Sequence, residues 1–134
     1  MEKLFKHLDY IQDIINRMAS NSFMLKGWAI TLTTGIFVLA SKDSEKSYFL
    51  IAFIPIIFFW LLDSYYLYKE KAFRDLYDYV RTINNIEEID FSMNINPQIL
   101  NCKSAPLKCL INISNLLFYL PLLGITIFLQ IYLK

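Results

Sequence analysis

The chain has 134 residues, of which 56% are apolar and 19% are charged, and its formal net charge is +1. Soluble domains average about 45–50% apolar and about 25% charged residues, so this chain is too apolar to be an ordinary soluble domain. The length fits a single domain, and the small net charge predicts no direct binding of duplex nucleic acid.

Residues 1–22 predict a cytoplasmic amphipathic helix. Its apolar residues recur at spacings of four and three, the heptad spacing of helices that pack along one another. This apolar seam consists of Leu4, Leu8, Ile11, Ile15 and Met18. Three partners fit it: the rest of the cytoplasmic part, a second copy of the chain, or the membrane surface. His7 falls on the polar side of the helix, where we expect it to be solvated.

Three apolar blocks predict transmembrane helices at residues 23–40, 48–67 and 111–133. A hydrocarbon layer of about 30 Å takes about 20 helical residues to cross, which matches these lengths. The second and third blocks carry central prolines, Pro55 and Pro121, which membrane helices tolerate as kinks. A domain of this size has too few polar residues to surround three such helices, so we expect an all-α integral membrane protein.

The placement of basic residues predicts the orientation of the chain in the membrane. Of its 13 lysines and arginines, all but Lys42, Lys46 and Lys134 fall on the side of the N-terminus and of residues 68–110. Cytoplasmic loops are enriched in lysine and arginine, so that side is expected to be cytoplasmic. The protein is then a multi-pass plasma-membrane protein with its C-terminus outside.

The cytoplasmic region 68–110 predicts a helix followed by a loop. Residues 69–84 contain neither proline nor glycine, so we expect the second span to continue as a helix up to Asn84–Asn85. Its apolar residues Phe73, Leu76 and Val80 recur at helical spacing, and the simplest partner for them is the N-terminal seam.

The rest of this region gives weaker signals. Residues 86–95 are ambiguous between irregular structure and a short strand. Asn96 followed by Pro97 has the pattern of an N-cap with proline at the first helical position, which predicts a short helix through Leu100.

Two charged residues fall inside the predicted spans, Lys26 in the first and Asp63 in the second. The two helices are antiparallel with a short loop, so both residues lie at a similar depth, about 5 Å into the apolar layer. An ion pair would lower the cost of burying each charge. The alternatives are independent snorkelling to the interface, a pair that only fixes packing, and a charged ring at the inner mouth of an oligomeric pore.

A second polar set consists of Thr31, Thr33 and Thr34 in the first span and Asn112, Asn115 and Gln130 in the third. Such side chains either hydrogen-bond between membrane helices or line a pore. Of these, Thr31, Thr34, Asn112 and Asn115 join Lys26 and Asp63 as our pore candidates.

No constellation for catalysis is recognisable. The chain has no glycine-rich phosphate loop and no nucleophile elbow. Its two cysteines, Cys102 and Cys109, and the distant His7 are too few for a structural zinc site, and we expect both thiols to be free. We therefore expect no enzymatic activity, no cofactor and no metal.

The stretches Asn16–Leu32 (NRMASNSFMLKGWAITL) and Trp60–Arg81 (WLLDSYYLYKEKAFRDLYDYVR) resemble small bacterial membrane proteins encoded beside anti-phage defence genes. Such proteins are similar in role to the membrane effectors of the Hailong and CBASS systems, in which a partner enzyme makes a nucleotide signal. The resemblance covers about the first two thirds of the chain. It implies an effector of the bacterial inner membrane that responds to a nucleotide signal or a cytoplasmic defence protein.

Two functions follow as hypotheses. In the first, several copies form or gate an ion-conducting pore, because three spans with few polar groups cannot enclose a channel alone. In the second, the chain is a non-conducting anchor whose N-terminal seam docks a cytoplasmic partner. A small transporter is less well supported, because the chain lacks inverted-repeat halves and central ionisable pairs.

Overall fold

The computed structural model describes residues 2–43, 47–83, 89–101 and 106–132, and within them it contains helices but no strands. The helices are α1 (Glu2–Asp43), α2 (Ser47–Thr82), α3 (Pro106–Leu110) and α4 (Ile113–Tyr132). Three of them, α1, α2 and α4, contain stretches long and apolar enough to cross a membrane. The predicted all-helical fold with three apolar spans is therefore confirmed.

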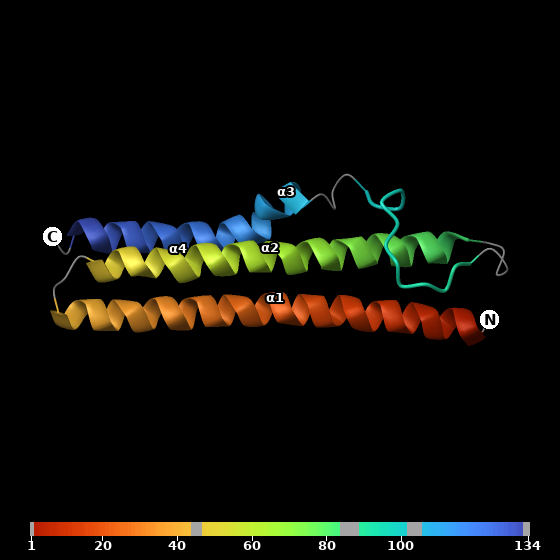
Figure 1. Ribbon diagram of the computed structural model, residues 1–134, viewed down its shortest axis with the longest axis horizontal. Coiled ribbons are helices and arrows are strands. Elements are labelled where there is room, and N and C mark those ends of the chain that lie inside the picture. Colours follow the sequence, from red (N-terminus) through yellow and green to blue (C-terminus); the bar gives the residue numbers. More distant parts are fainter. Residues whose placement is uncertain (1, 44–46, 84–88, 102–105, 133–134) are drawn as a thin grey trace.

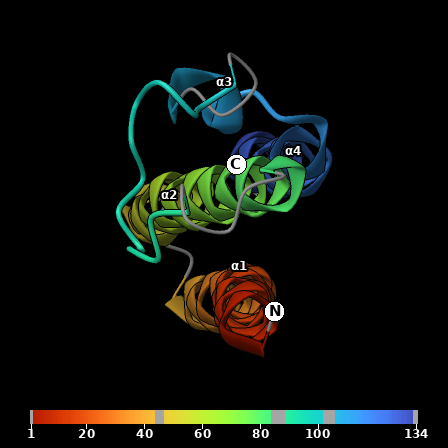
Figure 2. The same ribbon diagram turned by 90° about the vertical axis from the view of Figure 1, so that its right-hand side faces the viewer.

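The three long helices lie side by side, with α2 between α1 and α4 (Figures 1 and 2). Helix α4 has 20 residues, which at about 1.5 Å per residue matches the hydrocarbon thickness of a bilayer. Helices α1 and α2 have 42 and 36 residues and are therefore much longer than the layer. Their excess length projects as an antiparallel pair at the end that holds the N-terminus (Figure 1). The placement of this hairpin in the cytoplasm stays a prediction.

Helix α1 joins the expected N-terminal helix and the first span without interruption. Its buried face continues the heptad spacing through both parts but changes in character along the way. Large apolar residues, Ile11 and Ile15, are buried in the projecting half, whereas Ala29, Thr33 and Ala40 are buried in the other half. Small residues let membrane helices approach closely, and beside Ala29 the small face of α1 leaves room for the buried Ile56 of α2.

The projecting hairpin has its own apolar core. Ile11 and Ile15 from α1 pack with Leu76 and Val80 from α2 and with Ile89 from the following segment. The partly buried side chains around this core include Leu4, Leu8 and Phe73, whereas Met18 is partly buried outside it. Of the three partners that fit the N-terminal seam, the structure shows the one within the same chain.

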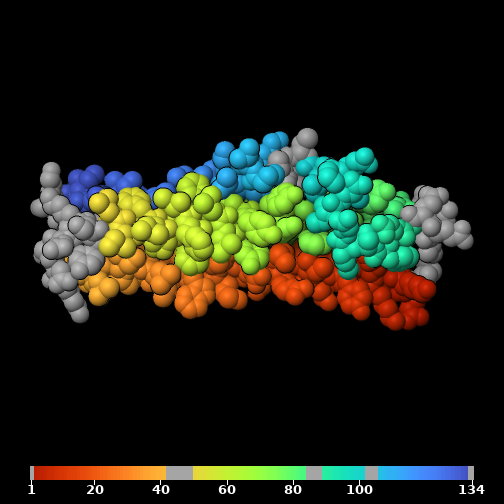
Figure 3. Space-filling model, viewed as in Figure 1, coloured from red at the N-terminus to blue at the C-terminus, as the bar shows by residue number. Residues whose placement is uncertain are grey.

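Segment 89–101 lies across the projecting hairpin (Figure 3). The carboxylate of Asp75 on α2 accepts hydrogen bonds from the backbone N–H of Asn101 at 3.0 Å and from its Nδ2 at 2.8 Å. Residues 89–95 are irregular rather than a strand. Three sequence features, the helix end at Asn84–Asn85, residues 86–88 and Cys102, lie outside the described residues.

The predicted helix from Asn96 to Leu100 is wrong, because the structure has only a turn there. The Asn96 side chain accepts a hydrogen bond from the N–H of Gln98 at 3.2 Å, and its carbonyl accepts one from Ile99 at 2.9 Å. An asparagine that caps its own turn can compete with helix formation. The attachment of Asn101 to α2 then directs the chain away from a helical path.

The prediction of a solvated His7 is also wrong, since its residue surface is only 5% exposed. The imidazole packs edge-on against the Phe91 ring, with 5.5 Å between the ring centroids. Segment 89–101 thus covers a side chain that the helical pattern alone left facing solvent. Beside it, hydrogen bonds from Ser92, with a smaller contribution from His7, hold the pKa of the exposed Asp90 carboxyl below its usual value.

Replacing Ile15 by alanine is expected to destabilise the projecting hairpin. A buried isoleucine that becomes alanine loses its packing contacts and leaves a cavity, at a cost of about 2–5 kcal/mol. The matched control is Phe5→Ala on the same helix, whose side chain is exposed. The stability of both variants is measured by denaturant unfolding, with hydrogen exchange of the α1 and α2 amides as the readout. An equal loss of stability in the two variants would show that the N-terminal seam is not packed as described.

Candidate functional site

The two charged residues of the predicted spans lie together in the contact between α1 and α2. The Lys26 ammonium forms an ion pair with one oxygen of the Asp63 carboxylate, and the Ser22 hydroxyl donates to the other. The ammonium also donates to Ser22 Oγ at 3.1 Å. The Asp63 side chain is 0% exposed and that of Lys26 only 17%. The result is a closed polar triad inside the protein.

The surroundings of the triad explain why both charges can stay there. An isolated charge among apolar helices is costly, and a paired one is tolerated only where further hydrogen bonds satisfy it. Both oxygens of the Asp63 carboxylate have a partner here. The Lys26 ammonium also lies 5.9 Å from the centroid of the Phe118 ring on α4, within the range of a cation–π contact.

A second polar network joins α2 to α4 beside the triad. The Asn115 amide donates from Nδ2 to Ser64 Oγ at 3.0 Å and to the carbonyl of Cys109 at 3.3 Å. Ser64 in turn donates to the carbonyl of Trp60 at 2.7 Å. The Trp60 indole stacks on Tyr119, with 6.0 Å between the ring centroids. The fully buried Asn115 therefore holds α4 against α2.

The pore candidates separate into an inner and an outer group. Lys26, Asp63 and Asn115 lie inside the chain's own helix contacts, whereas Thr31 and Thr34 are exposed on α1. Asn112 is partly buried at the junction of α3 and α4, where its backbone carbonyl accepts a hydrogen bond from Leu116 at 2.9 Å. The arrangement of the ion pair thus fits helix pairing, and the helices would have to separate for it to line a pore.

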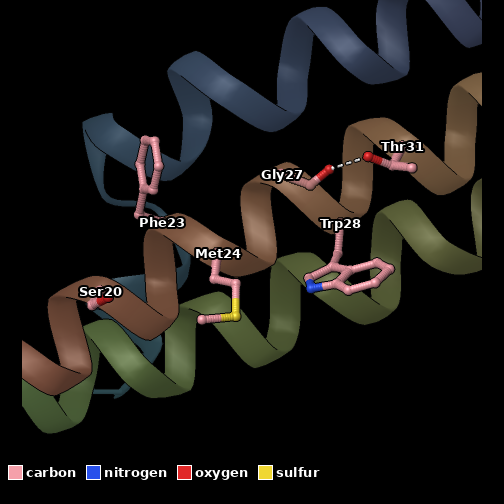
Figure 4. A pocket seen from close by; sticks show the side chains of 6 residues that line it. All are labelled: Ser20, Phe23, Met24, Gly27, Trp28 and Thr31. Carbon is pink, nitrogen blue, oxygen red and sulfur yellow. Dashed lines mark hydrogen bonds between the residues drawn. The ribbon is translucent and has the colours of Figure 1, made fainter.

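The exposed threonines belong to a regular stripe on the outer face of α1. Exposed residues recur there at spacings of four and three, and we call them the outer seam. It consists of Ser20, Met24, Gly27, Thr31, Thr34, Val38 and Ser41. Figure 4 shows its first half, a shallow surface groove at Gly27 between larger neighbours that include Phe23 and Trp28. A Cβ placed on Gly27 meets no atom within 4 Å, so the groove is open.

Sequence reasoning missed the serines that complete the polar networks. Ser22 lies one helical turn before Lys26, and Ser64 directly follows Asp63. These positions beside charges within predicted spans are the signal that could have identified them. The buried Thr33 shares the inner face of α1, and its hydroxyl has no hydrogen-bond partner among the described residues.

The remaining chemistry of the described residues is sparse. They contain no group of three or more histidine, cysteine or acidic side chains placed to hold a metal ion. Cys109 is a free, buried thiol in α3. Its burial raises the pKa of the thiol, which the nearby positive charge of Lys71 lowers in part.

Comparison with known proteins found no matching protein family, curated protein or solved structure. The likeness of Asn16–Leu32 and Trp60–Arg81 to defence-associated membrane proteins therefore stays a prediction.

Loss of one partner of the Lys26–Asp63 pair is expected to destabilise the protein more than loss of both. Lys26→Met and Asp63→Leu each leave a buried charge unpaired, which costs about 3–5 kcal/mol, whereas the double variant leaves none. A double-mutant cycle of unfolding free energies in detergent measures the coupling between the two residues.

The matched control is the Asp78–Arg81 pair, whose side chains are both 63% exposed. Exposed pairs contribute about 0–1 kcal/mol, so the coupling in this second cycle should be small. Similar coupling energies in the two cycles would contradict a special role of the buried pair.

Proposed function

We propose that the protein is a homo-oligomeric membrane protein that forms or gates an ion-conducting pore. The observation that carries the proposal is the outer seam of α1. Five of its seven residues are glycine, serine or threonine, and its positions from Met24 to Val38 fall within the predicted first span, on the exposed face of α1. Nothing else in the described chain covers this face, so lipid, water or another copy must contact it.

A conducting path of this protein needs more than one copy. The three long helices stand in a row with α2 in the middle, an arrangement that surrounds no central space (Figure 2). The buried side chains of Asp63, Ser64 and Asn115 are committed to contacts within the chain. Water could therefore follow exposed polar groups only between neighbouring copies.

The other exposed faces of the spans suit lipid better than the outer seam does. Helices α2 and α4 expose mainly large apolar side chains, including Ile54, Phe58, Leu117, Ile125 and Phe128. Contacts between membrane helices favour small residues, and hydroxyl groups suit a wetted surface. The outer seam has both properties, so we place α1 at the centre of the oligomer and α4 toward the lipid.

The Lys26–Asp63 pair and the projecting hairpin would then control the pore. The pair joins α1 to α2 at the level of Phe118, in the second turn of α4. A signal that binds the hairpin and favours a different packing of α1 on α2 would shift the population toward an open state. The prolines Pro55 in α2 and Pro121 in α4 are candidate hinge points within this movement.

The alternative function is a non-conducting anchor that docks a cytoplasmic partner. The surface expected to dock it, the N-terminal seam, is occupied by α2 and by Ile89. A partner would have to displace these contacts, so the packing favours the pore over the anchor. An effector role in anti-phage defence, with a nucleotide signal or a cytoplasmic defence protein as partner, rests on the resemblance alone and stays a prediction.

Cysteine accessibility tests the proposed pore lining. In a cysteine-free background (Cys102→Ser with Cys109→Ala), a hydrophilic thiol reagent should reduce the ion current of a Thr34→Cys variant in planar bilayers. The matched control is Ile125→Cys on the exposed face of α4. It lies at a similar depth, because α1 and α4 run in the same direction and Lys26 lies beside Phe118. The reagent should leave its current unchanged.

Two outcomes would count against the proposal. If the wild-type protein carries no current in bilayers, the anchor becomes the better account. If the reagent blocks the current equally in both variants, or only through Ile125→Cys, the pore is not lined by the outer seam.

A further inference from the structure

A pocket of about 200 Å³ lies between α2 and α3. From α2 it is lined by Leu61, Tyr65 and Tyr68, and from α3 by Leu107 and Leu110. These side chains give it an apolar interior with two phenol rings on one wall. The pocket is separate from the outer seam of α1, which belongs to another face of the protein.

Hydrogen bonds fix the α3 wall of this pocket. The Trp60 indole N–H donates to the carbonyl of Leu110 at 3.1 Å, and the Asn115 amide donates to the carbonyl of Cys109 at 3.3 Å. The last carbonyls of α3 are thus tied to α2 and α4. The short helix nevertheless leaves Leu107 74% exposed and the following Ile111 71% exposed. Such exposure is costly in water but favourable in the apolar part of a membrane interface.

Three lysines lie on the two helices that form the pocket, Lys69 and Lys71 on α2 and Lys108 on α3. The Lys69 ammonium lies 5.7 Å from the ring centroid of Tyr65 and 5.9 Å from that of Tyr68. Lys108 is exposed on α3, and Lys71 is close enough to Cys109 to act on it electrostatically. Among the described residues, none of the three forms an ion pair with a carboxylate. Within the described part of the chain, these lysines beside the apolar pocket therefore have no carboxylate partner.

The depth of the pocket matches the headgroup region of a bilayer. On α2, the lining residues lie within two helical turns of Asp63. On the other wall, α3 directly precedes α4, which is one of the predicted spans. In the orientation predicted from the basic residues, this level is the cytoplasmic interface. Basic pockets between membrane helices on the cytoplasmic side are typical binding places for anionic lipid headgroups.

We propose that the pocket between α2 and α3 binds an anionic phospholipid of the cytoplasmic leaflet. One acyl chain packs against Leu61, Leu107 and Leu110, and the phosphate lies between Lys69 and Lys108. A soluble anion would leave the apolar wall uncovered, and a zwitterionic lipid would leave the lysines without a net negative partner. The site is independent of whether the protein conducts ions.

Tryptophan quenching by brominated lipids tests the proposal. A Trp28→Phe variant keeps Trp60, which borders the pocket, as the single tryptophan. In phosphatidylcholine vesicles, a small fraction of brominated phosphatidylglycerol should quench Trp60 more strongly than the same fraction of brominated phosphatidylcholine. Lys69→Gln and Lys108→Gln should each lower the affinity for phosphatidylglycerol about fivefold. Leu107→Asn should weaken quenching by phosphatidylglycerol without changing the charge.

The charge-matched control is Lys3→Gln, which removes one exposed positive charge near the start of α1. It should leave the preference for phosphatidylglycerol unchanged. Equal quenching by the two brominated lipids would overturn the proposal. The same holds if the control lowers the affinity as much as the Lys69 and Lys108 substitutions do, because attraction would then reflect overall charge and not this pocket.

Discussion

The arrangement of this protein depends on one ion pair between two apolar helices, formed by Lys26 and Asp63 and completed by Ser22. Since either charge alone would be costly among these buried apolar side chains, the pair holds α1 and α2 in one register. On one side of this point the two helices project as a hairpin with an isoleucine-rich core. On the other side the small buried face of α1 packs against α2, and Asn115 attaches α4 to α2 through Ser64. The triad therefore connects the part that could receive a signal with the part that could conduct ions.

The buried face and the outer seam of helix α1 have different roles. Its buried face packs against α2 and holds the protomer together. This face has large apolar residues such as Ile11 in the hairpin and small ones such as Ala29 at the level of α4. Its outer seam is exposed and combines glycine, serine and threonine with Met24 and Val38. Because one continuous helix bears both, a change in how the hairpin packs would also reorient the outer seam. This direct mechanical connection is the basis on which we relate a cytoplasmic signal to a pore between copies.

Periodicity and charge placement predicted much of this arrangement. The three apolar blocks gave the spans, and the heptad spacing from Leu4 to Met18 identified the face of α1 that packs on α2. The similar depth of Lys26 and Asp63 placed them within reach of each other, as the structure has them.

Contacts between distant segments were not predictable in this way: His7 is buried only because segment 89–101 crosses the hairpin, and Ser64 meets Asn115 only after α4 folds back. The outer seam was not predictable from the sequence, because its small residues give little hydrophobic signal. Their regular spacing becomes recognisable only once the buried face of α1 is known.

The most direct test of the central claim, that several copies surround a path along the outer seam of α1, is the mass of the protein in lipid nanodiscs, corrected for bound lipid. The account predicts one discrete assembly of at least four copies, in which the α1 helices surround a central space. It also predicts that Gly27→Leu, which fills the groove at Gly27 without touching the protomer's own contacts, shifts this assembly toward smaller species. A monomer or dimer for the wild-type protein would contradict the account, because no conducting path could then run between copies.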